Sequence, residues 1–205
     1  MLRALTLNCT LKRTDPKEPS STERLLSEIE AEWRGMGVET ESVRIADLNI
    51  LPGVTSDEGS GDDWPAVRRK IMDADILVIG TPIWLGQPSS VCKRVLERMD
   101  AFLSEGDESN GHMPSYGKVA GVAVVGNEDG AHHVCAEVFQ ALVDVGFTVP
   151  ASASTYWVGE AMGSTNYIDL KHKPEKTAGT TRTLARLTAH LAKVLKASPY
   201  PSIKA

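Results

Sequence analysis

The chain has 205 residues, a length that suits a single domain over residues 1–205. Hydrophobic residues make up 41% and charged residues 24%, as in soluble globular proteins, and the net charge of -5 gives no electrostatic reason to bind nucleic acid or an anionic membrane. No apolar stretch approaches the ~20 residues of a membrane span and no signal-peptide pattern is visible, so we expect a cytoplasmic protein.

The first half of the chain alternates strand and helix patterns. Residues 3–8 predict a strand and residues 23–36 an amphipathic helix. Residues 39–45 predict an edge strand with one wet face. Glycine, proline and aspartate fill residues 47–65 and predict a loop. A short helix over 64–72 and a buried apolar strand over 76–79 follow.

The second half continues the alternation. Its predicted elements are a helix over 89–103, a polar loop over 104–116, a strand over 119–125, a helix over 131–145, a strand over 148–158 and a helix over 180–196. Strict alternation at this spacing indicates right-handed crossovers and an α/β domain, with a parallel sheet covered by helices on both faces.

Cysteines and histidines give no sign of a metal centre. Cys9, Cys92 and Cys135 are far apart and lack the spacing of a zinc or iron–sulfur site. His132 and His133 are adjacent, so on a helix their side chains point about 100° apart, and no partner has ligand spacing. We predict no metal.

Ligands of open parallel sheets bind outside the carboxyl ends of the strands, which directs attention to three loops. The loop after the first strand is rich in hydroxyls, including Thr10, Ser21 and Thr22, and it holds the cation Lys12. It ends at a helix N-terminus, where free amides favour a phosphate. The alternative is a plain capping box, with Ser20 as the cap and Glu23 three residues on. The P-loop and GxGxxG nucleotide fingerprints are both missing.

The loops after the third and fourth strands carry turn residues and an aromatic side chain. The third-strand loop contains Thr81, Pro82, Ile83, Trp84, Leu85 and Gly86. Pro82 fixes a turn, Gly86 permits close approach of a ligand, and an exposed Trp84 can pack on a planar ring unless it is only structural. The fourth-strand loop contains Gly126, Asn127, Glu128, Asp129 and Gly130, with His132 shortly after.

At these loops the sequence resembles the flavodoxin-like NAD(P)H-dependent FMN and quinone reductases. The strand and turn through Thr81-Pro82-Ile83-Trp84-Leu85-Gly86 are similar to that family's T-P-x-[YW] pattern, and the likeness spans nearly the whole chain. The resemblance implies a flavodoxin-like three-layer sandwich with a five-stranded parallel sheet in the order 2-1-3-4-5. One departure is the phosphate loop, which residues 12–19 lengthen.

The resemblance also implies a cofactor and its contacts. FMN would have its phosphate held by Thr10, Lys12, Ser21 and Thr22. Its ribityl chain and ring would lie along 82–86, under a turn formed by 126–130 with His132. Residues 163–167 would also reach the ring.

We expect a hydride to pass from NADPH or NADH to the flavin and on to a quinone, free flavin or similar small acceptor, with no catalytic side chain required. The family resemblance further implies a homodimer or homotetramer. Two alternatives stay open: an electron-carrier flavodoxin-like protein without NAD(P)H activity, which the acidic loops 57–63 and 104–109 favour, and a binding module that has lost its flavin.

Overall fold

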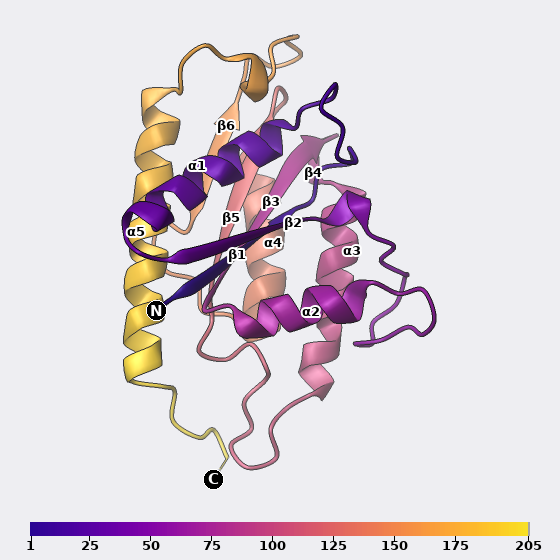
Figure 1. Ribbon diagram of the computed structural model, residues 1–205, viewed down its shortest axis with the longest axis vertical. Helices are drawn as coiled ribbons and strands as arrows, with labels where there is room; N and C mark the ends of the chain where they lie inside the picture. Colours follow the sequence, from indigo (N-terminus) through magenta and orange to yellow (C-terminus); the bar gives the residue numbers. More distant parts are fainter. Residues whose placement is uncertain (205) are drawn as a thin grey trace.

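The computed structural model describes residues 1–204, and its strands and helices alternate along the chain (Figure 1). The elements are β1 (Arg3–Asn8), α1 (Ser21–Gly35), β2 (Glu39–Arg44), η1 (Ile45–Asp47), α2 (Trp64–Asp73), β3 (Ile76–Trp84), β4 (Gln87–Pro88), α3 (Ser90–Met99), η2 (Asp100–Ser104), β5 (Val119–Gly126), α4 (Ala131–Asp144), β6 (Ser154–Val158), η3 (Tyr167–Asp169) and α5 (Glu175–Ala197).

The sheet has the strand order β2-β1-β3-β5-β6, and all neighbouring strands on this path are parallel. The short β4 pairs antiparallel with the end of β3. Counted without β4, the parallel strands follow the predicted order 2-1-3-4-5, so the flavodoxin-like three-layer fold is confirmed. The winding reverses at β1, and the carboxyl ends of β1 and β3 therefore border a crevice that a ligand can enter.

Two apolar cores cover the faces of the sheet. Helices α1 and α5 contact each other on one face, where Leu25 and Ile29 of α1 share a core with Leu184 of α5 and Trp33 donates to the carbonyl oxygen of Ala185 at 3.1 Å. The other face is covered by α2, α3 and α4, and their core is continuous with the apolar side chains of β1, β3 and β5. The central strands are buried on both faces, which is why their sequences are unbroken apolar runs.

Several element boundaries differ from the predictions by one or two residues, the predicted helix 89–103 divides into α3 and η2, and three other differences have a clear cause. Strand β3 extends to Trp84 because its last residues pair with β4, where the sequence predicts only a loop. Strand β6 begins at Ser154 and not at 148, because the backbone turns at Ser152, which has a φ of 54°. Helix α5 begins at Glu175, directly after Pro174, five residues earlier than predicted.

The loop between η1 and α2 is fixed by a buried ion pair. Arg98 of α3 donates to Asp62 at 2.7 Å, and both side chains are fully buried. The same guanidinium donates to the carbonyl oxygens of Leu51 and Thr55. No helix among residues 1–204 is long and apolar enough to cross a membrane.

Candidate functional site

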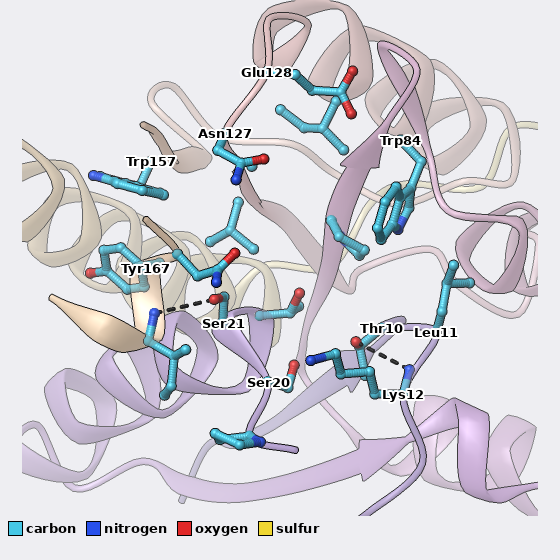
Figure 2. Close-up of a pocket in the computed structure, with 18 residues that line it drawn as sticks. Thr10, Leu11, Lys12, Ser20, Ser21, Trp84, Asn127, Glu128, Trp157 and Tyr167 are labelled. Carbon is cyan, nitrogen blue, oxygen red and sulfur yellow. Dashed lines mark hydrogen bonds between the residues drawn. The ribbon is translucent and has the colours of Figure 1, made fainter. Parts of the chain in front are cut away.

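A cleft of about 250 Å³ opens at the carboxyl ends of β1, β3 and β5, where the loops that follow these strands gather (Figures 1 and 2). Four segments line it: the β1–α1 loop with the start of α1, the end of β3, the β5–α4 loop, and the chain from β6 to η3. The lining residues are Thr10, Leu11, Lys12, Pro19, Ser20, Ser21, Thr22, Pro82, Ile83, Trp84, Val125, Gly126, Asn127, Glu128, Trp157, Asn166, Tyr167 and Ile168.

One end of the cleft is a cluster of hydroxyl groups around the N-terminus of α1. Ser20 caps the helix, because its Oγ accepts from the amide of Glu23 at 3.2 Å. Ser21 Oγ accepts from the amide of Ile168 at 3.2 Å, and Thr10 Oγ1 accepts from the amide of Lys12 at 3.4 Å. These bonds use oxygen lone pairs and leave the hydroxyl protons free to donate. The end of the cleft therefore offers several donors to an anion.

The capping and ligand-binding interpretations of Ser20 are compatible in the structure. Ser20 is the helix cap and also lines the cleft. The Glu23 carboxylate does not complete a capping box, because it pairs with Arg44 at 2.6 Å.

The lengthened loop of residues 12–19 is held against the end of β2. Asp47 accepts from the amide and the hydroxyl of Thr14, at 2.7 and 2.6 Å. Arg44 donates to the carbonyl oxygen of Arg13 at 3.1 Å. The hydrogen bonds from Thr14 lower the pKa of Asp47, so the carboxylate stays charged at neutral pH.

Lys12 extends from this loop toward Ser20 and the hydroxyl cluster (Figure 2). Among the ion pairs of residues 1–204, none includes Lys12. A cation without a carboxylate partner, placed at a helix N-terminus, gives this end of the cleft a positive potential.

The turn between β3 and β4 and the β5–α4 loop pack against each other at the opposite end. Glu128 accepts from the amide of Leu85 at 3.1 Å. Gly130 has a φ of 120°, and a Cβ there would lie 2.9 Å from the Cα of Gly86. Gly130 is therefore needed for the close contact between the two loops, and Gly86, with a φ of 75°, is needed for the turn that follows Trp84 at the mouth of the cleft.

Aromatic side chains form much of the apolar wall. Trp84 is 53% exposed, whereas Tyr167 is fully buried and packs on Trp157 with ring centroids 5.4 Å apart. Tyr167 donates to Glu28 at 2.7 Å, and burial and this carboxylate raise the pKa of the phenol. Arg24 holds the η3 backbone by donating to the carbonyl oxygens of Tyr167 at 2.6 Å and Leu170 at 2.9 Å.

Most of the residues that the sequence singles out come together in this cleft. Those that line it are Thr10, Lys12, Ser21, Thr22, Pro82, Ile83, Trp84, Gly126, Asn127 and Glu128. Those that lie outside its lining are Thr81, Leu85, Gly86, Asp129, Gly130 and His132.

The residues outside the lining have other contacts. Thr81 is buried, and its hydroxyl oxygen accepts from the amide of Ser89 at 3.1 Å. His132 contacts Tyr156 on β6, with 3.0 Å between the ring nitrogen and the phenol oxygen. Leu85 is 91% exposed at the tip of its turn.

Sequence reasoning missed several lining residues. Leu11, Pro19 and Val125 adjoin predicted residues, and Trp157 lies in the predicted last strand. Ile168 belongs to η3, a single short turn with no apolar period to reveal it. Asn166 and Tyr167 fall in the segment 163–167 that the family resemblance implicates.

Comparisons with known proteins find relatives that match nearly the whole chain. A crystal structure of RosB with the bound intermediate 8-demethyl-8-formylriboflavin-5′-phosphate superposes with a TM-score of 0.88 and 36% identity, covering 98% of this chain and 82% of that one. The 8-demethyl-8-aminoriboflavin-5′-phosphate synthase of Streptomyces davaonensis is 37% identical over 97% of this chain and 80% of its own length.

A third similarity is to only part of a longer protein. The divalent metal cation transporter MntH of Mycobacterium bovis is 38% identical over 96% of this chain. The match covers 29% of that protein, so this chain spans about three tenths of its length.

The family itself is identified by a model that matches most of the chain. The description of that model is NADPH-dependent FMN reductase, and the match covers residues 3–163, from β1 through the cleft-lining end of β5 to the segment after β6. This chain therefore belongs to the NADPH-dependent FMN reductase family of FMN-binding oxidoreductases.

Proposed function

We propose that the chain binds one FMN in the cleft and uses it to carry a hydride from NADPH or NADH to a small acceptor. The observation that supports this most directly is the joining of two unlike ends in one cleft. A hydroxyl-rich, positively charged end at α1 matches a phosphate monoester, and the apolar end with Trp84 matches a flat ring system.

The donors at α1 fit a doubly charged phosphate. The hydroxyls of Thr10, Ser20 and Ser21 donate to its oxygens, and Lys12 supplies a compensating charge. The first amides of α1 have no intrahelical acceptor and add to the cradle.

The cleft volume of about 250 Å³ lies below the ~300–1,000 Å³ typical of sites that enclose a ligand. A ligand of FMN size would therefore not be fully enclosed, and its uncovered part would be open to a second substrate.

Bound FMN would supply the redox chemistry, hydride transfer between a nicotinamide and a small acceptor. The protein binds and orients the ring. Ile83 and Trp157, which line the cleft, would shield the ring from water, and the half-exposed Trp84 at the mouth would border the place where a nicotinamide or quinone stacks. None of these steps requires a nucleophile or a general acid from the chain.

The test is the visible spectrum of the purified protein, loaded with FMN and then treated anaerobically with NADPH or NADH. Immediate bleaching of the flavin bands, followed by recovery on adding a quinone, is the expected result. Flavin that accumulates a stable semiquinone and ignores both nucleotides would identify an electron carrier instead. Failure to take up FMN would overturn the proposal.

A matched pair of lysine variants tests the phosphate end. Lys12→Ala should raise the Kd for FMN by about 10-fold or more, the loss of one charge-assisted contact, and should leave the Kd for riboflavin unchanged. Lys17→Ala is the control, because Lys17 is exposed on the same loop but does not line the cleft.

A second candidate function is chemistry on the flavin itself. It is favoured by the likeness to the Streptomyces davaonensis synthase and to RosB, at 36–37% identity over nearly the whole chain. Under this alternative FMN is a substrate that is converted and released. Mass analysis of the flavin after many turnovers decides between the two: an unchanged FMN mass supports the reductase, and a new flavin mass supports the modifying enzyme.

A further inference from the structure

A second groove adjoins the cleft on the far side of Leu11. It has a volume of about 300 Å³ and lies between the β1–α1 loop, η1 with the residues after it, and the first turn of α3. Leu11 lines both hollows and forms the ridge between them. The residues of the second groove are Leu11, Arg13, Ile45, Ala46, Leu48, Ile50, Ser90, Val91 and Arg94.

The lining of this groove combines an apolar floor with two guanidinium groups and contains no carboxylate. Arg94 donates to the carbonyl oxygen of Ile50 at 3.0 Å, and its buried Nε has no hydrogen-bond partner. The nearest carboxylates lie outside the lining of the groove. Glu97 forms an ion pair with Arg94 at 3.9 Å, and the charged carboxylate of Asp47, near Arg13, accepts two hydrogen bonds from Thr14.

The lengthened loop builds one wall of the groove. Arg44 and Asp47 hold the backbone around Arg13, so Leu11 and Arg13 are fixed over the end of β2. The other wall is the start of α3, a helix of ten residues whose dipole also favours an anion. The loop that departs from the family pattern thus creates a positively charged groove next to the cleft.

We propose that this groove binds the adenosine end of NADPH, with Arg13 and Arg94 holding its 2′-phosphate. The inference rests on the proposed function, because it assigns a place to the second half of the hydride donor. The nicotinamide end must reach the flavin ring in the cleft. The adenosine end has an aromatic base that suits an apolar floor and, in NADPH alone, a phosphate monoester that suits a pair of arginines.

The first measurement is a comparison of kcat/KM for NADPH and NADH in the FMN-loaded protein. Arg13→Ala and Arg94→Ala should each lower kcat/KM for NADPH by about 10-fold through KM, the loss of one charge-assisted contact, and leave NADH unchanged. Arg186→Ala is the matched control, because Arg186 is exposed on α5, on the opposite face of the sheet.

Because Arg94 also anchors Ile50, a further variant keeps both arginines. Ser90→Glu adds a carboxylate to the exposed first turn of α3, where a negative charge is favourable for the helix but repels a phosphate in the groove. We expect the same selective loss of NADPH activity.

A binding measurement separates this inference from the proposed function. Adenosine 2′,5′-bisphosphate, titrated calorimetrically into the FMN-loaded protein, should bind about 10-fold or more tightly than 5′-AMP, and Ser90→Glu and Arg13→Ala should remove the difference. This result would support the groove even if neither nucleotide bleached the flavin, in which case only the hydride transfer would fail. Equal binding of the two nucleotides, or a preference for NADPH that all three variants retain, would overturn the assignment and leave the reductase standing.

Discussion

The hydrogen bonds between Asp47 and Thr14 should set the affinity for the phosphate of FMN, although neither residue lines the cleft. Asp47→Ala removes the acceptor of two bonds, at 2.7 and 2.6 Å, that hold the loop carrying Lys12. Bonds to a charged group contribute roughly 1.5–3 kcal/mol each when shielded, but Asp47 is exposed, so we discount the pair to about 1 kcal/mol in total. The Kd for FMN should therefore rise about fivefold.

The assay is a titration of flavin fluorescence with the wild-type chain, Asp47→Ala and Asp47→Asn. The amide side chain of Asp47→Asn retains an oxygen that accepts from the Thr14 amide, so the effect of this substitution should be smaller. Riboflavin, which lacks the phosphate, should bind all three proteins equally. An equal loss for riboflavin and FMN would refute the reasoning, since it would mean that the substitution deforms the whole cleft.

The pH dependence of the stability effect of Asp47→Ala follows from the pKa of Asp47 in the wild-type chain. Thr14 lowers the pKa of Asp47 below the ordinary value of 3.8. A group with a lowered pKa in the folded protein contributes stability above its unfolded pKa and loses it as the pH falls through the folded value. The difference in the free energy of unfolding between the wild-type chain and Asp47→Ala should accordingly be the same at pH 5 and pH 8, because both values lie above the pKa.

Four further predictions concern the stability, the loop contacts and the assembly of the chain. Asp62→Asn leaves Arg98 buried without its counter-charge and should lower the free energy of unfolding by about 3 kcal/mol in urea titrations. Burial opposes the charge of Asp62, but hydrogen bonds from Arg98 and three backbone amides lower its pKa to about 2. The charged carboxylate should therefore contribute about 2 kcal/mol to the free energy of unfolding above pH 3.8, and this contribution should be lost as the pH falls toward 2. Gly130→Ala should lower the melting temperature and weaken FMN binding, because the added Cβ would press on Gly86. Gly179→Ala in α5 is the control: its Cβ would meet nothing within 4 Å, so it should stabilise the fold by about 0.5–1 kcal/mol. If a second copy covers the exposed Leu85, Leu85→Asn should shift sedimentation toward the monomer without unfolding the chain; an unchanged mass would locate the interface elsewhere.

Local patterns were sufficient to predict the alternation of strands and helices and a parallel sheet, whereas the strand order followed from the family resemblance. Strand β1 has the predicted bounds, and the apolar runs in β3 and β5 mark central strands because both of their faces are buried. The misplaced boundaries have local causes. The pairing of Trp84 with Gln87 depends on the turn at Leu85 and Gly86, both of which have positive φ, and neither apolar periodicity nor β propensity reveals such a turn.

The sequence predicts the residues at one end of the cleft better than those at the other. The phosphate end follows a strand directly and precedes a helix, so its hydroxyls could be found from chain order alone. The wall formed by Trp157 and Tyr167 could not, because Tyr167 is placed by long-range bonds to Arg24 and Glu28, which lie about 140 residues earlier. The second groove was invisible for the same reason, since it joins three segments that are separate in sequence.

The structure also indicates which end of the site is complete within one chain. Thr10, Ser20 and Thr22 are buried, and bonds to neighbouring segments hold the loop and helix that carry them. At the ring end, Leu85 and Met162 have left-handed backbones, with φ of 52° and 63°, yet both side chains are 91% exposed. Such a conformation costs roughly 1–2 kcal/mol for a residue other than glycine, and no burial within the chain offsets it. We therefore expect the phosphate end to determine where FMN binds, and a bound nucleotide or a second copy of the chain to complete the surroundings of its ring.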